Sequence, residues 1–288
     1  MAFATFANWA AQAQDTQQNL AEAVLALEAL ESGNSPKQIR SHMHETLLVM
    51  KEAIKTGLNP EIKSRSGLCG GDAARMNSQG AFEFGDLFSR ALSYAVATAE
   101  VNSSMGRIVA APTAGASGVV PGVLIAASEV FDKTDEELVD ALLVSAGIGG
   151  VFAARATLSG AAGGCQAEIG VGASMAAGAL TYLMGGTAEQ VSHAAALAMQ
   201  GQLGLVCDPV AGLVEIPCIM RNSTGASVAL AGAHMALAGV TFAIPFDEVV
   251  VASARVGASI PPTLRETARG GLAVTPTGQC IACSFKTP

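Results

Sequence analysis

The chain has 288 residues, half of them hydrophobic, and a formal net charge of −8 at pH 7. This is enough to bury a substantial core in one large domain or two ordinary ones. The acidic balance argues against nucleic acid or a membrane as a partner, because nucleic acids and anionic membranes attract clusters of lysine and arginine. The first residues show no basic start followed by an apolar export segment, so we expect a cytoplasmic protein with reduced cysteines.

Apolar residues at helical spacing predict helices from the start of the chain. A first helix should end at Gly33, and one of its faces is apolar: Leu20, Val24, Leu27 and Leu30. Ser35 and Pro36 then offer an N-cap and a first-turn proline for a second helix that ends near Gly57. We expect these two helices to be antiparallel neighbours.

Three capping boxes predict further helix starts, because each pairs a threonine with an acid or amide three residues later. They are Thr134–Glu137, Thr187–Gln190 and Thr263–Glu266. Strand signals are sparse, and the exceptions are the short runs Ile108–Ala111 and Leu205–Cys207. Breaks rich in glycine and proline near residues 66–71, 112–122, 160–172, 204–217 and 270–278 therefore predict loops between helices, where functional residues concentrate. The sequence predicts one all-α domain over residues 1–288, with Gly/Pro-rich loops that carry the site and a mobile tail from about residue 275.

Two uncharged stretches, residues 169–188 and 222–246, are long enough to cross a bilayer. Both are rich in Ala, Gly, Ser and Thr, and they lack the flanking basic residues and aromatic belts of membrane spans. This composition favours a tightly packed helical core over a membrane or scaffold component.

Three cysteines lie in sequence settings that suit a metal centre better than a buried thiol. Cys165 follows two glycines, Cys207 precedes Asp-Pro, and Cys218 follows Ile-Pro, so regular helix is interrupted at each site. Three such ligands would leave one coordination position open. We do not count Cys69 among the candidate metal ligands, because its loop setting favours a thiol without a functional role. Cys280 and Cys283 have redox-motif spacing but lack the strand-helix context of that motif.

Other candidates have competing interpretations. The loop 112–118 carries hydroxyls and backbone N–H groups that could bind a substrate carboxylate, or simply cap the helix that follows. The histidines, which are His42, His44, His193 and His234, fit solvated or core positions better than catalysis. Ser284-Phe285-Lys286 matches the start of a pyridoxal-phosphate lysine motif, but the residues that should follow are missing, so no pyridoxal phosphate is expected. Phosphate-loop, nucleophile-elbow and dinucleotide fingerprints do not occur in the sequence.

Four segments match one known family. They are Pro-Thr113-Ala-Gly-Ala-Ser117-Gly, Gly-Cys165-Gln-Ala-Glu-Ile-Gly-Val-Gly-Ala-Ser-Met-Ala-Ala, Gly-Leu-Val-Cys207-Asp-Pro-Val-Ala-Gly-Leu-Val-Glu-Ile-Pro-Cys218 and Arg221-Asn222. With them the chain resembles the alpha chain of iron–sulfur-dependent L-serine dehydratase. The likeness runs from residue 70 to residue 274, and the cysteine separations of 42 and 11 residues agree with the family pattern.

The resemblance implies an α-helical enzyme that converts L-serine to pyruvate and ammonia at a [4Fe–4S] cluster. It implies Cys165, Cys207 and Cys218 as cluster ligands. We expect Thr113, Gly115, Ser117 and Asn222 to hold the carboxylate or amino group of the substrate. Either Cys280 or Cys283 could reach the open iron in the resting enzyme. The sequence does not place the general base.

In this family a second segment with a Ser-Ser-His-Thr-x-Gly-Pro motif is either fused to the chain or carried by a beta chain, and this sequence has no match to it. The resemblance therefore implies a partner beta chain and a higher hetero-oligomer. Two other enzymes stay open: a related helical L-cysteine desulfidase, and a zinc lyase with three thiolate ligands.

Overall fold

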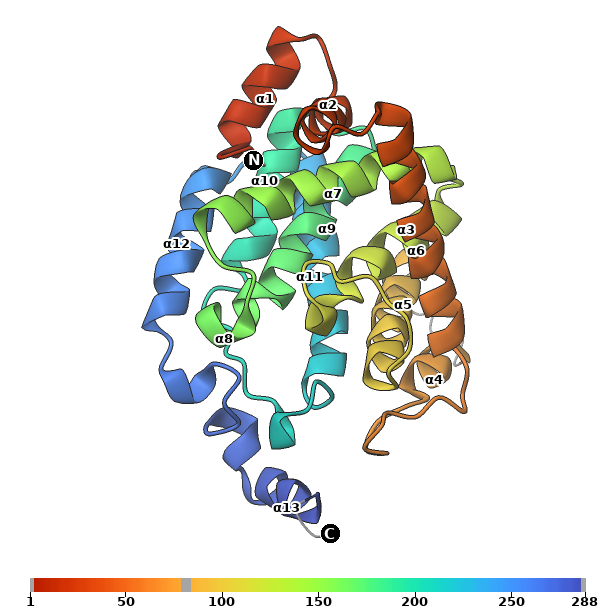
Figure 1. Cartoon of the computed structure of the whole chain (residues 1–288), viewed down its shortest axis with the longest axis vertical. Coiled ribbons are helices and arrows are strands. Elements are labelled where there is room, and N and C mark those ends of the chain that lie inside the picture. The colour runs from red at the N-terminus through yellow and green to blue at the C-terminus, as the bar shows by residue number, and fades with distance from the viewer. Residues whose placement is uncertain (1–2, 79–83, 286–288) are drawn as a thin grey trace.

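The computed structural model describes residues 3–78 and 84–285 and shows an all-α protein, which confirms the predicted fold class (Figure 1). Within these ranges thirteen α-helices are joined by loops and short 3₁₀ turns, and the only strand-like pairing is an isolated bridge between Cys207 and Arg265. The helices are α1 Phe6–Asp15, α2 Leu20–Ser32, α3 Pro36–Gly57, α4 Asp72–Ser78, α5 Asp86–Ser103, α6 Val119–Val130, α7 Asp135–Arg155, α8 Gly160–Gly163, α9 Ile169–Leu183, α10 Ala188–Gln200, α11 Cys218–Leu237, α12 Phe246–Ser259 and α13 Pro276–Ser284.

The helix boundaries predicted near the N-terminus are confirmed. α2 ends at Gly33, which adopts a left-handed conformation with φ of 72°, and α3 begins after Ser35, whose side chain accepts the backbone N–H of Gln38. The boxes that begin at Thr134 and Thr187 open α7 and α10, each with both reciprocal hydrogen bonds. Leu30 differs from the predicted apolar face of this helix. It lies in the last turn of α2 with 82% of its surface exposed.

Helix α9 forms the centre of the protein. It packs against α6, α7, α10 and α11, and every residue in it except Tyr182 is buried. A helix that is apolar on all sides can be covered on all sides only if its neighbours come close, and small side chains permit this. A Cβ atom on Gly178 would overlap Ile148 of α7. The hydroxyl of Ser174 donates to the carbonyl of Ala195 on α10 at 2.8 Å, so a polar atom buried in this helix is satisfied.

The uncharged stretch that begins at residue 169 is therefore a core helix surrounded by other helices of the same chain. Among the described residues, α7 has the length and apolar composition of a membrane span, and 67% of the window that meets this test is buried inside the protein. Burial of this extent is typical of a core helix.

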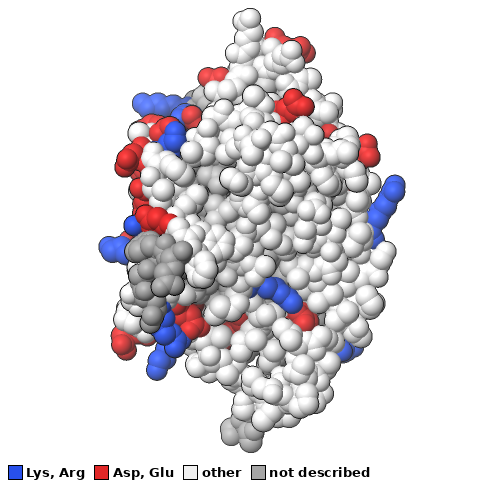
Figure 2. All heavy atoms as spheres, turned by 180° about the vertical axis from the view of Figure 1, so that it is seen from behind, with Lys and Arg blue, Asp and Glu red and all other residues white. Residues whose placement is uncertain are grey.

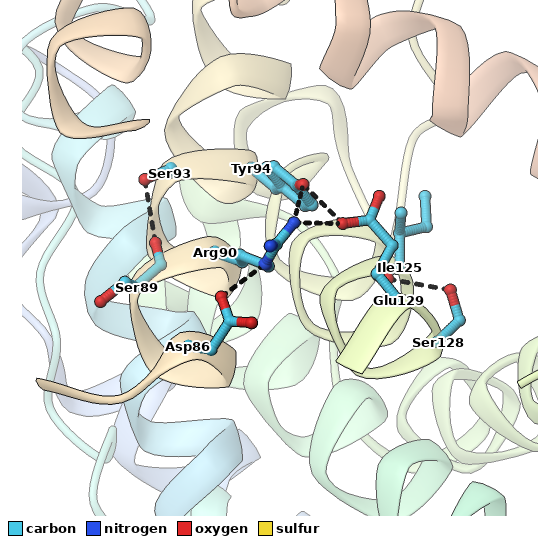
Figure 3. A network of polar contacts seen from close by, with 8 residues as sticks. All are labelled: Asp86, Ser89, Arg90, Ser93, Tyr94, Ile125, Ser128 and Glu129. Atoms are coloured by element: carbon cyan, nitrogen blue, oxygen red, sulfur yellow. Dashed lines mark hydrogen bonds and ion pairs between the residues drawn. The ribbon is translucent and has the colours of Figure 1, made fainter. Parts of the chain in front are cut away.

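Helices α5 and α6 pack against each other and are tied near the end of α6 by a polar network. The guanidinium of Arg90 on α5 donates to Asp86 at 2.5 Å and to Glu129 of α6 at 2.9 Å, and the hydroxyl of Tyr94 donates to the same Glu129 oxygen at 2.7 Å (Figure 3). Burial, followed by the hydrogen bond to Glu129, raises the pKa of Tyr94 to about 12. A Cβ atom on Gly122 would lie 2.7 Å from the backbone nitrogen of Ala95, so α6 can approach α5 closely only with glycine there. This contact fixes the start of α6 and the loop that leads into it.

Candidate functional site

The three cysteines predicted as metal ligands are all buried and lie on three separate segments. Cys165 begins a 3₁₀ turn, Cys165–Ala167, directly before α9; Cys207 lies in the loop after α10; and Cys218 is the first residue of α11. The side chains of Cys165 and Cys207 interact closely enough to shift each other's pKa, the sulfur of Cys207 lies 4.0 Å from Glu168, and the charge of Cys165 acts on Cys218. The fold thus brings together residues that are 42 and 11 positions apart in the sequence.

A glycine and a buried glutamine join the segments of Cys165 and Cys207. Gly164 has φ of 76°, and a Cβ atom there would lie 2.8 Å from the carbonyl oxygen of Leu205. Next to the cysteine, the N–H of Gln166 donates to that same carbonyl at 3.0 Å. The Gln166 side chain accepts the N–H of Gly204 at 2.7 Å and donates to the carbonyl of Ser253 on α12 at 2.7 Å. These contacts use both the oxygen and the nitrogen of the amide and fix both segments against α12.

Cys207 is held on its other side by the segment 264–266. The Cys207 N–H donates to the carbonyl of Leu264 at 2.9 Å, and the Glu266 N–H donates to the carbonyl of Cys207 at 2.7 Å. The capping box predicted at Thr263–Glu266 is therefore wrong. The chain instead forms a short 3₁₀ turn, Pro262–Leu264, and Glu266 turns to φ of 60°, because these backbone groups pair with the cysteine segment.

Arg221 places a positive charge beside the thiols. Its guanidinium donates to the carbonyl of Val206 at 2.9 Å and forms an ion pair with Asp208 at 2.8 Å. The hydrogen bond from Cys207 lowers the pKa of Cys165 and outweighs its burial, and Arg221 lowers it further. The pKa of Cys207 is raised by the same hydrogen bond and by burial. Burial raises the pKa of Cys218 to about 12, and the charge of Cys165 adds to this shift. One thiolate is stabilised here, whereas three would need further positive charge.

Asn222 connects the loop 112–118 to the cysteine on α11. Its side-chain nitrogen donates to the carbonyls of Gly115 and Cys218 at 2.8 and 2.9 Å, and its oxygen accepts the N–H of Gly118 at 2.9 Å. The side chain is fully buried. Sequence analysis expected Asn222 to hold substrate, but in this structure backbone groups occupy its amide, an arrangement that favours a role in positioning the loop.

Glu168 is a site residue that sequence analysis did not assign, although it lies within the Cys165 motif. One of its oxygens accepts the hydroxyl of Thr113 at 2.7 Å, and the other lies 4.0 Å from the sulfur of Cys207. Burial raises the pKa of this carboxyl group. The available signal was local, because an acid three residues after a cysteine immediately precedes an apolar helix.

Ser117 and Gly115 complete the loop side of the site. Ser117 is fully buried, and its hydroxyl has no hydrogen-bond partner among the described residues. Such a group is uncommon in a folded interior, and this hydroxyl is available to hydrogen-bond a ligand. Gly115 lies close to Glu168, since a Cβ atom on it would be 3.4 Å from a carboxylate oxygen. The four predicted substrate residues and the three cysteines therefore belong to one connected region through Asn222 and Glu168.

A profile of the serine dehydratase alpha-chain family matches residues 15–273. The chain belongs to this family. A probable L-serine dehydratase alpha chain from Bacillus subtilis is 46% identical over 263 residues, covering 90% of this chain and 87% of the relative. An L-serine dehydratase alpha chain from Peptoniphilus asaccharolyticus is 43% identical over 265 residues and covers 91% of both chains. An L-serine dehydratase from Streptomyces coelicolor is 39% identical over 267 residues, but this chain covers only 57% of its length.

The remaining cysteines of this serine dehydratase alpha-chain family member lie outside the buried group. Cys280 and Cys283 are exposed on α13, which packs against the turn Val210–Gly212 that follows Cys207. The segment predicted as a mobile tail is thus helical as far as residue 284, and its mobility stays a prediction. Lys286 lies outside the described residues. Cys69 is partly buried, and burial raises its pKa to about 11, with Glu215 adding to the shift.

The histidines have other surroundings. His193 accepts the N–H of Phe242 at 3.3 Å, and His44 lies 3.7 Å from Asp135. His42 and His234 are exposed at their helix surfaces. His42, His44 and His234 agree with the interpretation of solvated histidines. At His193 only Nδ1 is satisfied, since Nε2 is buried without a hydrogen-bond partner among the described residues and lies 3.6 Å from Glu189.

Replacing Asn222 by alanine should lower the free energy of unfolding by about 1–3 kcal/mol, because the buried N–H of Gly118 and two carbonyls lose their partner. Urea unfolding of Asn222→Ala and of Thr224→Ala, an exposed neighbour on the same helix, measures this loss. Equal stability of the two variants would show that the amide does not anchor the loop.

Proposed function

We propose that this chain is the alpha subunit of an L-serine dehydratase and that it binds a [4Fe–4S] cluster through Cys165, Cys207 and Cys218. The observation that carries the proposal is the meeting of three buried cysteines with a loop that bears Thr113 and the unpartnered hydroxyl of Ser117. The family and the names of its members supply the substrate, L-serine.

The residues of the site fit such a cluster. The donors are three thiols, the ligand type that holds iron–sulfur clusters, and their burial disfavours three negative charges unless a cationic group binds. Within the described residues no group of three His, Cys, Asp or Glu side chains is placed to hold a single metal ion. Three thiolates with one open position also suit the zinc lyase, and iron and sulfide analysis separates the two.

When bound, a cluster with three protein thiolates supplies an iron that can act as a Lewis acid on a substrate oxygen. The protein's own residues hold and orient the substrate. In this proposal the Ser117 hydroxyl and the loop around Gly115 take its carboxylate, and Asn222 keeps this loop against Cys218. The Thr113 hydroxyl of the same loop donates to Glu168. Loss of the α-proton and of water from L-serine gives aminoacrylate, which becomes an imine and hydrolyses to pyruvate and ammonia.

A beta chain completes the enzyme in this proposal and supplies the missing general base. Two relatives are named alpha chains, and the longer Streptomyces coelicolor relative extends well beyond the part that matches this chain. On the face shown in Figure 2, charged side chains gather toward the edges and leave a broad uncharged area, as an interface within a hetero-oligomer would. A cytoplasmic location stays a prediction from composition. The L-cysteine desulfidase alternative predicts sulfide release from L-cysteine in the same assay.

Substitution of Cys165, Cys207 or Cys218 by serine should remove most of the bound iron from a full complement of about four per chain, and should abolish pyruvate formation. Iron and sulfide analysis of anaerobically prepared protein measures the loss. Cys69→Ser is the matched control and should keep both. The double variant Cys280→Ser/Cys283→Ser should also keep its iron, because the proposed tail ligand is replaceable. Full iron and activity in any of the three buried-cysteine variants would contradict the proposal.

The purified chain, loaded with iron and sulfide, should form little or no pyruvate from L-serine on its own, and addition of a family beta chain should restore turnover. The anaerobic pyruvate assay with and without the second polypeptide measures this dependence. Full turnover by the single chain would refute the two-chain enzyme while leaving the cluster proposal intact.

A further inference from the structure

Glu168 is a carboxylate without a counter-ion in the middle of the site. It occupies the N-cap position of α9, yet its side chain makes no hydrogen bond to the first turn of that helix. In the described parts of the chain, no lysine, arginine or histidine forms an ion pair with it. A half-buried carboxylate with no cation carries a desolvation cost, which an oppositely charged ligand would reduce.

The two oxygens of Glu168 face different parts of the site. The Thr113 hydroxyl donates to Oε1 at 2.7 Å, so this oxygen is held by the loop proposed to take the substrate carboxylate. Oε2 lies 4.0 Å from the sulfur of Cys207, a proposed cluster ligand. The carboxylate therefore lies between the two groups that would bind opposite ends of a small substrate.

Glycines make room for this carboxylate. A Cβ atom on Gly160 would lie only 2.5 Å from Oε2, and one on Gly115 would lie 3.4 Å from Oε1. Any larger residue at position 160 would displace Glu168. The surrounding backbone thus approaches the carboxylate closely from both sides.

We infer that Glu168 binds the α-ammonium group of L-serine, and that Thr113 holds the side-chain carboxylate of Glu168 in position. This inference rests on the proposed function and names the group that selects an amino acid over a hydroxy acid of the same shape. L-serine offers three polar groups, and the loop hydroxyls and the cluster account for its carboxylate and β-hydroxyl. The ammonium group is the remaining cation, and Glu168 is the unpaired anion beside those two subsites.

A purely structural role for Glu168 makes a different prediction. If the carboxylate only anchored Thr113, its loss would disturb the loop and weaken every ligand that uses the loop. An ammonium-binding role affects only ligands that carry the ammonium group. The compound 3-hydroxypropionate separates the two roles, because it has the carboxylate and β-hydroxyl of serine but no amino group.

The test uses the cluster-loaded enzyme, with its beta chain where turnover requires one, and compares wild type with Glu168→Gln. We expect KM for L-serine to rise about 10- to 100-fold, the effect of losing a charged hydrogen bond. The inhibition constant of 3-hydroxypropionate should change by less than about threefold, since no charge pair is lost. Anaerobic titration of the cluster absorption with each compound gives the same comparison without turnover. Glu189→Gln, an exposed acid on α10, is the control and should match wild type.

Circular dichroism and iron content establish that each variant is folded and loaded. Glu168→Asp retains the charge on a shorter side chain, and it should show a smaller rise in KM with an unchanged inhibition constant; it replaces Glu168→Gln if that variant does not fold. The inference is overturned if KM and the serine titration do not change, or if serine and 3-hydroxypropionate weaken by the same factor. A wild-type holoenzyme that forms no pyruvate from serine would instead reject the proposed function, and the inference with it.

Discussion

Three thiols from separate segments are buried together, and much of the surrounding structure can be understood from the electrostatic cost of this arrangement. Deprotonated thiolates in a protein interior repel one another and lose hydration, so they need nearby positive charge. Arg221 supplies one charge and is itself fixed by Asp208 and the carbonyl of Val206. A single guanidinium cannot balance three thiolates and Glu168. A cationic cluster and an ammonium-bearing substrate are the two groups that we propose complete the balance.

The helical core positions the cysteine segments through close backbone packing. The segment of Cys165 leads directly into α9, whose small residues allow neighbouring helices to approach, and α11 begins at Cys218 and packs along α9. Close packing continues at the site itself, where a side chain on Gly160 or Gly164 would overlap neighbouring atoms. The small residues of α9, which resemble a membrane span in the sequence, and these glycines together permit the short distances between backbones at the site.

The sequence predicted local features well, because they depend on neighbouring residues. The caps at Ser35, Thr134 and Thr187 and the stop at Gly33 follow from side-chain and backbone chemistry within one turn. The box at Thr263 failed because a contact distant in sequence, with Cys207, takes the backbone groups that a helix would use. Glu168 was missed for a similar reason. Its hydrogen-bond partner Thr113 is 55 residues away, and no periodicity links the two. The resemblance to a family provided the roles of the cysteines, which their spacing alone left open between a cluster and zinc.

Mössbauer spectroscopy of the anaerobically prepared protein labelled with ⁵⁷Fe tests the central claim most directly. With three fixed cysteine ligands, the fourth iron of the cluster is either open or held by the replaceable tail cysteine. With L-serine bound, that iron should be chemically distinct, so about a quarter of the signal should change on addition of serine and the other three quarters should not. Four equivalent irons in the presence of serine, or a spectrum that serine does not alter, would contradict a cluster held by Cys165, Cys207 and Cys218 with one iron open to substrate.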